Sequence, residues 1–350
     1  MGSFPRRLRP ASLPALIVSL AALLLCLPVA AGALRWVVAD AVWPWDPAAL
    51  CAERAGICWP FITEKAGLIF FGTYPHDLLW RPCMASLLLC ALAVLTGLWL
   101  SGRGTRPGAA GLALLWAAVL AAALVLLGGG VWGMVPVGSL RWNGLPVLLL
   151  LSLGSVALAF PLGVLLALAR EQDRNRLTAW LAACYIETAR GVPMLTVLFT
   201  GIFVLPLMLP SGSALPPVAA VLVALILFHA AYFAEDIRGG LRALPRGQAE
   251  AAQALGLSRR SRLGEVLLPQ AIRRALPSIV NSVIGAYKDT SLVVVVGIHD
   301  LTATARMAFS DPAWRAQALE GYFVIGLWFF MSCAFLSMIG RRLQRREAGQ

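Results

Sequence analysis

Long apolar stretches recur along the whole of this 350-residue chain. A helix needs about 20 consecutive, predominantly apolar residues to cross the hydrocarbon core of a bilayer. Stretches of this kind lie near residues 11–31, 83–100, 109–127, 147–169, 192–210, 217–237, 277–297 and 320–340. Charged residues make up only 13% of the chain, whereas a soluble domain contains about 25%. The sequence therefore predicts an all-α integral membrane protein with about eight transmembrane helices.

The first apolar stretch has one feature of a secretory signal peptide, because Arg6, Arg7 and Arg9 precede it. Its apolar part is longer than the roughly 7–15 residues typical of such a signal. Seven further apolar stretches follow it. We therefore expect an uncleaved transmembrane helix at this position.

Lys and Arg are concentrated in alternate connecting segments. These segments hold 21 of the 29 Lys and Arg residues and comprise 1–10, 101–108, 170–191, 238–276 and 341–350. Cytoplasmic loops of membrane proteins carry an excess of Lys and Arg. The distribution therefore predicts that both termini are cytoplasmic, which agrees with an even number of spans.

The composition divides the chain into an accessory region and a core. We expect residues 1–144 to form an accessory region with three transmembrane helices and a Trp-rich periplasmic loop at about 32–82. Residues 145–340 contain the other five spans and form the core, which includes a long cytoplasmic loop at about 238–276. Residues 341–350 form a basic cytoplasmic tail.

The seven cysteines include no CxxC pair and have no nearby His at metal-binding spacing, so we expect no metal site. Cys51 and Cys58 fall in the predicted periplasmic loop. They form a disulfide if that side of the membrane is oxidising, and otherwise they remain two unpaired thiols.

The cytoplasmic loop at 238–276 has the local signals of two helices. Pro245 suits an early helical position. Backbone N–H groups in the first helical turn have no partner within the helix, so the N–H that proline lacks is not needed there. Residues 246–255 are rich in Ala, Gln, Glu and Leu, which favour helix. Gly256 then provides a helix stop and Ser258 an N-cap for a second, short helix that runs toward Pro269. The loop is therefore predicted to form a helix–turn–helix that projects into the cytoplasm.

The first of these two helices carries alanines at 249, 251, 252 and 254, with Glu250 as its only acidic residue. Small side chains allow another surface to approach closely, and Glu250 offers a charge to a partner arginine. We interpret this helix as a contact surface for another protein.

The same residues form a recognisable signature. Glu250-Ala251-Ala252, then Gly256, then Val266-x-Leu268-Pro269 resembles the EAA-x3-G-x9-I-x-L-P pattern of importer permeases of the ATP-binding-cassette class, with every spacing matched. Val266 replaces the usual isoleucine, which is a loss of one methylene. The resemblance implies a core of five helices of the type I importer kind. It also implies that Glu250, Ala251, Ala252, Gly256 and Leu257 dock into a groove on an ATPase subunit.

Further motifs resemble those of the polar amino acid branch of this family. They are Glu187-x-x-Arg190-Gly191-x-Pro193, Glu235-x-x-Arg238-Gly239-Gly240, Leu268-Pro269-Gln270-Ala271 and Lys288-Asp289-Thr290-Ser291-Leu292. The eight spans and the Trp-rich outer loop resemble the larger permease of general L-amino-acid uptake systems.

This resemblance implies a permease in the bacterial inner membrane that takes up L-amino acids by alternating access. The implied partners are a cytoplasmic ATPase dimer, a second related permease and a periplasmic amino-acid-binding protein, together with membrane lipid. No cofactor is expected on this chain.

Several ionisable residues in or near the spans have two interpretations. One interpretation is that the segment Lys288-Asp289-Thr290-Ser291 lines or gates the substrate path. The other is that Lys288 and Asp289 neutralise each other and hold the core together. Glu187 with Arg190, and Glu235 with Arg238, have helical i,i+3 spacing and are expected to form salt bridges at the cytoplasmic ends of spans. His229 is expected to be a packed histidine.

The predicted helix–turn–helix also has the pattern of a DNA-reading motif, with Arg259, Arg260 and Arg262 on its second helix. Both of its ends are tethered to the membrane within a few residues, which leaves little reach into a major groove. We therefore expect no nucleic acid partner. The three arginines are expected to face anionic lipid headgroups or the ATPase.

The chain shows no catalytic motif. A phosphate-binding loop needs a lysine after a Gly-rich turn, and neither Lys65 nor Lys288, the only lysines, follows such a turn. ATP hydrolysis is therefore expected on a separate subunit. Two alternatives remain open on sequence alone: a secondary transporter driven by an ion gradient, and a membrane scaffold without transport activity.

Overall fold

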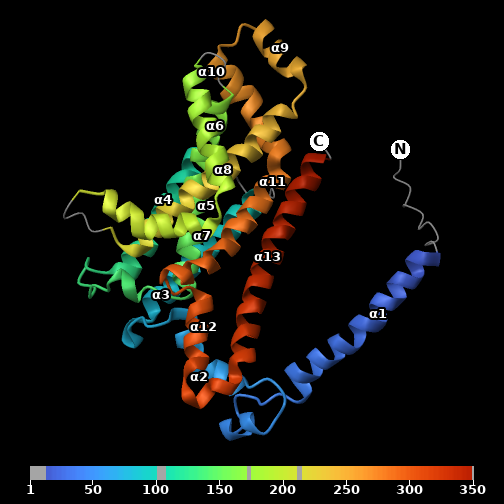
Figure 1. Cartoon of the computed structure of the whole chain (residues 1–350), viewed down its shortest axis with the longest axis vertical. Helices are drawn as coiled ribbons and strands as arrows, with labels where there is room; N and C mark the ends of the chain where they lie inside the picture. Colours follow the sequence, from blue (N-terminus) through green and yellow to red (C-terminus); the bar gives the residue numbers. More distant parts are fainter. Residues whose placement is uncertain (1–12, 101–107, 172–174, 211–214, 349–350) are drawn as a thin grey trace.

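The computed structural model describes residues 13–100, 108–171, 175–210 and 215–348. The basic residues Arg6, Arg7 and Arg9, and nearly all of the predicted cytoplasmic segment 101–108, lie outside these described residues. The described residues contain helices, turns and two isolated bridges, and no strand. The α-helices are α1 (Leu13–Leu34), α2 (Trp59–Phe71), α3 (Trp80–Leu100), α4 (Ala109–Gly128), α5 (Leu145–Arg170), α6 (Arg176–Gly191), α7 (Met194–Phe199), α8 (Pro217–Arg242), α9 (Arg246–Ala254), α10 (Arg259–Ser261), α11 (Leu268–Asp289), α12 (Leu301–Ser310) and α13 (Ala318–Ala348), as Figure 1 shows.

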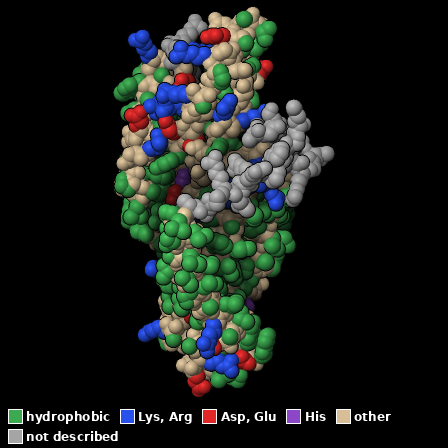
Figure 2. Space-filling model, turned by 90° about the vertical axis from the view of Figure 1, so that its right-hand side faces the viewer, with side chains coloured by type: hydrophobic (Ala, Val, Ile, Leu, Met, Phe, Trp, Pro, Cys, Tyr) green, Lys and Arg blue, Asp and Glu red, His purple; other side chains and the backbone are tan. Residues whose placement is uncertain are grey.

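Seven helical runs among the described residues are long and apolar enough to cross a membrane, or eight if the bent pair α6 and α7 forms one span. The seven are Leu13–Ala39, Trp80–Leu100, Ala110–Gly128, Leu145–Arg170, Pro217–Arg242, Arg259–Val296 and Pro312–Arg345. This confirms the prediction of an all-α membrane protein with about eight spans. Figure 2 shows the corresponding surface, with a broad apolar region between two ends that carry charged side chains.

The predicted straight span at 192–210 is the exception. The segment Met194–Met208 is shorter than the about 20 residues needed for a crossing, and its axis is bent by 108° from that of α6. The bend follows from the local sequence. Pro193 disfavours helical geometry in the residue before it, and Val192 accordingly adopts an extended conformation with φ −92° and ψ 136°. The helix therefore ends at Gly191 and restarts in a new direction.

The centre of the molecule is formed by α5, α8 and α11. Gly163 on α5 lies so close to α8 that a Cβ there would be 2.6 Å from Cβ of Phe233. Gly240 on α8 is equally close to α11, because a Cβ there would overlap the Ala271 carbonyl. Small residues of this kind let transmembrane helices pack backbone to backbone. The two glycines thus fix how the three helices cross.

The predicted periplasmic loop is more ordered than expected, because it contains α2 and packs against the core. The Lys65 ammonium lies 2.8 Å from the Asp311 carboxylate, and the indole N–H of Trp314 donates to Glu64 at 3.0 Å. The Thr304 hydroxyl donates to the Ile69 carbonyl at 2.6 Å. Cys51 and Cys58 are joined by a disulfide. Residues 40–79 therefore form a cap over α12 rather than a free loop.

Helix α1 differs from all other predicted spans because none of its residues is buried. It is apolar on every side and leaves the bundle at an angle in Figure 1. Just beyond it, Trp36 packs edge-on against Phe323 with 5.5 Å between the ring centroids. A helix that is apolar all round suits a surface that faces lipid or another hydrophobic helix.

Candidate functional site

The predicted cytoplasmic helix–turn–helix forms a hairpin at one end of the molecule, opposite α2 and α12 in Figure 1. Pro245 was expected at an early helical position, but its ψ of 135° is extended and it lies directly before the first residue of α9. Gly256 follows the end of the helix with a φ of +71°. A positive φ of this kind favours glycine, which has no Cβ. The Ser258 hydroxyl accepts a hydrogen bond from the Ser261 N–H at 3.2 Å. The predicted helix stop and N-cap are thus confirmed.

The second helix of the hairpin was predicted to be short, and this prediction is wrong. A single helical run extends from Arg259 to Val296, so the hairpin continues into the membrane-spanning part of α11. Pro269 lies in the first turn of α11, directly after a wider π-helical turn at Arg262–Leu267. A proline is tolerated in a first helical turn, and the π-turn connects that turn to the helix before it. The second arm of the hairpin is therefore continuous with α11.

Side chains inside the hairpin hold α9 in place. The Gln270 amide donates to the Gln248 side-chain oxygen at 3.2 Å, and Arg262 donates to the Gln253 side-chain oxygen at 2.9 Å. Ala252 lies on the inner face of α9 and is buried, with 3% of its surface exposed. The sequence-predicted contact residues thus divide into a buried anchor, Ala252, and an outer face.

The outer face of α9 is exposed. It comprises Glu250, Ala251, Ala254 and Leu255, and Leu257 lies just beyond the turn. Leu255 was missed by the sequence analysis, although its side chain is 80% exposed at the tip of the hairpin. The sequence feature that could have identified Leu255 is its position, since it is an apolar residue directly before Gly256, the glycine that ends the helix. Exposed apolar residues next to small ones provide a surface that a partner protein can cover.

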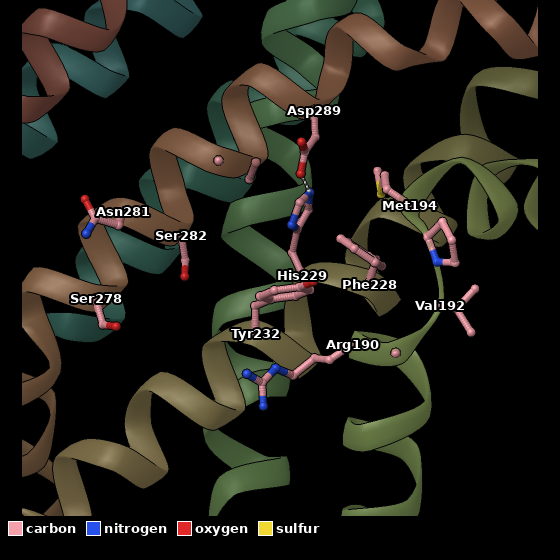
Figure 3. Close-up of a pocket in the computed structure, with 14 residues that line it drawn as sticks. Arg190, Val192, Met194, Phe228, His229, Tyr232, Ser278, Asn281, Ser282 and Asp289 are labelled. Atoms are coloured by element: carbon pink, nitrogen blue, oxygen red, sulfur yellow. Dashed lines mark ion pairs between the residues drawn. The ribbon is translucent and has the colours of Figure 1, made fainter.

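A cavity of about 650 Å³ lies between α8, α11 and the bend that joins α6 to α7. Figure 3 shows its lining, with Tyr232, His229 and Phe228 from α8 and Ser278, Asn281, Ser282 and Asp289 from α11. Arg190, Val192 and Met194 line it from the bend. Ser278, Ser282 and Asp289 of α11 are separated by four and seven positions, that is by one and two helical turns, which places them on one face of the helix beside Asn281. This spacing of polar residues in a membrane-spanning helix was a signal for the cavity that the sequence analysis did not use.

Asp289 and His229 face each other across this cavity. The Nε2 atom of His229 lies 4.0 Å from Oδ2 of Asp289, and it has no hydrogen-bond partner among the described residues. His229 is buried, as expected of a packed histidine, and its ring edge points toward a carboxylate in the cavity. An ionisable pair inside a membrane protein is costly and usually has a functional or structural purpose.

The other residues predicted with Asp289 take different positions. Lys288 is exposed and does not line the cavity. The hydroxyls of Thr290 and Ser291 donate to carbonyls of their own helix, those of Tyr287 at 2.7 Å and Lys288 at 2.8 Å. Of the four residues predicted for a substrate path, the structure places only Asp289 in the cavity wall.

A group of ion pairs lies at the hairpin side of the cavity. The predicted pair on α8 is present, because Nε of Arg238 donates to Oε2 of Glu235 at 2.8 Å. The predicted partner of Glu187 was Arg190, but Glu187 instead pairs with Arg170 at 2.6 Å. Arg190 lies 3.7 Å from Glu235, with its guanidinium carbon 5.7 Å from the centroid of the Tyr232 ring. Helical spacing finds partners only within one helix, so the sequence could not indicate Arg170.

The cavity and hairpin offer no metal site among the described residues, since no group of three or more His, Cys, Asp or Glu side chains comes together there.

Residues 159–348 match the family described as "Binding-protein-dependent transport system inner membrane component". The chain is 38% identical over 315 residues to the inner membrane amino-acid ABC transporter permease protein YhdY of Escherichia coli, covering 89% of this chain and 84% of that protein. It is 31% identical over 363 residues to the glutamate/glutamine/aspartate/asparagine transport system permease protein BztC of Rhodobacter capsulatus, covering 86% and 80%. A solved amino acid ABC transporter structure with histidines is similar with a TM-score of 0.51 and 30% identity, over 58% of this chain and 92% of that one.

Proposed function

The chain belongs to the family of binding-protein-dependent transport system inner membrane components, and on that premise we propose that it carries L-amino acids through the membrane by alternating access. It is a multi-pass membrane permease subunit of an ATP-binding-cassette importer and not an enzyme. The proposed cargo is supported by the similarity to permeases named for amino acid transport. The family match gives no support to an ion-gradient-driven transporter or a scaffold.

One structural observation carries the mechanism. The hairpin leaves α8 at Arg242 and re-enters the membrane as the run that ends at Val296, so the same two helices hold both the hairpin and most of the cavity. A displacement of α9 by a partner therefore moves the α8 and α11 walls of the cavity. Asp289 and the polar face of α11 are the proposed contacts for a polar substrate in transit.

The proposed assembly follows from this arrangement. A cytoplasmic ATPase binds the exposed face of α9, which includes Glu250, Ala251 and Leu255, and hydrolyses the ATP. A second, related permease completes the pathway, and a periplasmic binding protein delivers the amino acid. This chain itself needs no cofactor. The basic hairpin end is cytoplasmic, as are both termini, and residues 1–144 are an accessory region attached to the transport core at 145–340.

The charge of Glu250 provides the test. Reversal of this exposed charge by Glu250→Arg is expected to abolish the ATP turnover that substrate stimulates in the assembled complex, while the chain still inserts in the membrane. Glu265→Arg is the matched control, because Glu265 is also exposed but lies on the π-helical turn Arg262–Leu267 and not on α9, and it should leave the stimulation as in the parent. Unchanged stimulation in Glu250→Arg would show that α9 is not the ATPase contact.

A further inference from the structure

The last residue of α5 and the residue after it contact two different parts of the protein. Arg170 points toward the cavity side, where its guanidinium lies 2.6 Å from Glu187 on α6 and 3.5 Å from Glu235 on α8. Glu171 points toward the hairpin, and its carboxylate lies 3.2 Å from Nε of Arg242. The backbone carbonyl of Glu171 also accepts a long hydrogen bond of 3.4 Å from Arg259 of the hairpin. Arg170 and Glu171 thus connect the hairpin with the ion pairs beside the cavity.

On the hairpin side, Glu171 lies in a shared cleft. A space of about 410 Å³ separates α9 from the end of α5, and Glu171, Glu250 and Arg259 all line it. Because helix ends leave carbonyls without intrahelical partners, the Arg259 guanidinium satisfies a group that α5 cannot. Any displacement of the hairpin relative to α5 must therefore stretch or shift these contacts.

On the cavity side, the ion pairs hold the end of α6. Arg170 binds Glu187, and Glu235 lies 3.7 Å from Arg190, which lines the cavity. The side chains of Arg170 and Glu235 are only 16% and 22% exposed, so salt screens them less than a surface pair. Helix α6 ends immediately afterwards at the 108° bend, whose residues form one wall of the cavity.

We propose that Arg170 and Glu171 are positioning residues that transmit movement of the hairpin to the α6–α7 wall of the cavity. The contacts run from Arg259 to Glu171, through the backbone to Arg170, and from there to Glu187 directly and to Arg190 by way of Glu235. These contacts supply a second connection between the hairpin and the cavity, separate from the continuous helix of α11. They act on the α6–α7 wall of the cavity, which is not part of α11. This inference rests on the proposed coupling role of the hairpin.

The test uses the full chain in the reconstituted complex with its ATPase, second permease and binding protein. Cys26, Cys83, Cys90, Cys184 and Cys333 are replaced by serine, and Cys51 and Cys58 are kept. Asn281→Cys reports accessibility of the cavity to a thiol reagent, and Ala254→Cys reports hairpin docking by cross-linking to the ATPase. A non-hydrolysable ATP analogue is expected to change the Asn281→Cys labelling rate about tenfold, a common size for coupling between sites.

Arg170→Gln is the test variant, since it removes the charge that binds Glu187 and Glu235. We expect the ATP-induced change in labelling to fall to less than about twofold, with the Ala254→Cys cross-link unchanged. Arg176→Gln removes an exposed arginine from the start of the same α6 and should leave both readouts as in the parent. If Arg170→Gln prevents assembly, Arg170→Lys replaces it. The ammonium keeps the positive charge but lacks the planar guanidinium fork that holds Glu187 and Glu235 in a fixed geometry, so a partial loss is expected.

The outcomes distinguish a failure of this inference from a failure of the proposed docking of the hairpin to the ATPase. A full ATP response in Arg170→Gln or Arg170→Lys, with the hairpin cross-linked, overturns the role of these positioning residues. An absent cross-link in the parent overturns the hairpin docking instead. Loss of response in Arg170→Gln together with a normal cross-link and a normal Arg176→Gln control supports the transmission path.

Discussion

The ammonium of Lys65 lies 2.8 Å from the carboxylate of Asp311, and this contact joins the cap formed by residues 40–79 to the core across 246 residues of sequence. Glu64 lies 3.2 Å from the same ammonium. The hydrogen bond from Lys65 lowers the pKa of Asp311 below its usual 3.8, and the same bond raises the pKa of Lys65 above 10.5. The cap is therefore attached by a contact that depends on pH.

Each partner of this ion pair makes the stability of the folded state depend on pH in a different direction. Asp311 has a lowered pKa in the folded state, so its contribution is present above the ordinary carboxyl pKa of 3.8 and is lost as the pH falls through the folded value. Lys65 has a raised pKa, so its contribution is present below 10.5 and is lost as the pH rises through the folded value. Between these limits the ion pair is intact.

We therefore predict that Lys65→Met lowers the thermal midpoint of the detergent-solubilised chain near pH 7, and that this difference narrows as the pH falls from 3.8 through the lowered pKa of Asp311. The parent loses the interaction in acid, so the two midpoints converge there. Tryptophan emission is a suitable measurement, because Trp314 packs beside this contact. A difference between parent and variant that stays constant over this pH range would contradict the prediction.

A second prediction concerns the disulfide between Cys51 and Cys58, which closes a short loop with a sequence separation of 7. Closing a loop of this size stabilises the folded segment by about 2 kcal/mol in the chain-entropy description. Cys51→Ser with Cys58→Ser should therefore speed trypsin cleavage after Arg54, which lies inside that loop. Cys184→Ser changes an exposed cysteine on α6 and serves as the control. Equal cleavage rates in the double variant and the control would count against a stabilising disulfide.

Apolar length and local helix signals allowed much of this fold to be predicted. The spans follow from the free energy of placing apolar residues in lipid, and the hairpin turn follows from Gly256 and Ser258. The bend at Pro193 was not predicted, because the apolar stretch continues across it and length alone indicated one span. The run from Arg259 to Val296 was also missed, because Pro269 normally marks a helix boundary and residue spacing did not indicate the π-helical turn at Arg262–Leu267 that precedes it.

The candidate site was predicted only where its residues are close in sequence. Glu235 and Arg238 are one helical turn apart, and their pair was predicted. Arg170 binds Glu187 and Glu235 from a third helix, and His229 meets Asp289 from 60 positions away. Such partners depend on how helices cross, which is set by close approaches such as that of Gly240 to Ala271. No single-sequence spacing rule reports those crossings.

A third prediction uses that close approach. Gly240→Ala places a Cβ against the Ala271 carbonyl at the crossing of α8 and α11, and the overlap should destabilise the fold by about 1–3 kcal/mol. Gly239→Ala is a matched control one residue away, since a Cβ there meets nothing within 4 Å. Alanine favours helix over glycine by up to about 1 kcal/mol, so this control should be at least as stable as the parent.

Thermal stability of both glycine variants in detergent, measured by retention of a monodisperse elution peak after heating, distinguishes the two positions. We expect the peak of Gly240→Ala to be lost at a lower temperature than that of the parent. Equal behaviour of the two variants would mean that α8 and α11 do not approach as closely as the structure indicates.

The last prediction separates the two interpretations of the intramembrane charges. If Asp289 contacts substrate, then Asp289→Asn removes an ionic contact worth about 1.5–3 kcal/mol. That loss corresponds to roughly tenfold or more in the uptake KM for L-amino acids, with assembly unchanged. If Asp289 instead only balances charge within the bundle, the variant should lose stability or assembly rather than affinity.

Lys288→Gln is the control for this comparison, because Lys288 is the neighbouring residue, is exposed and does not line the cavity. It should leave the KM of uptake close to the parent value. Uptake of a mixture of labelled L-amino acids into proteoliposomes gives KM and maximal rate for all three proteins. An increase in KM confined to Asp289→Asn assigns the carboxylate to the substrate path. A parallel effect in both variants would assign the two charges to the structure of the bundle, because only Asp289 faces the cavity.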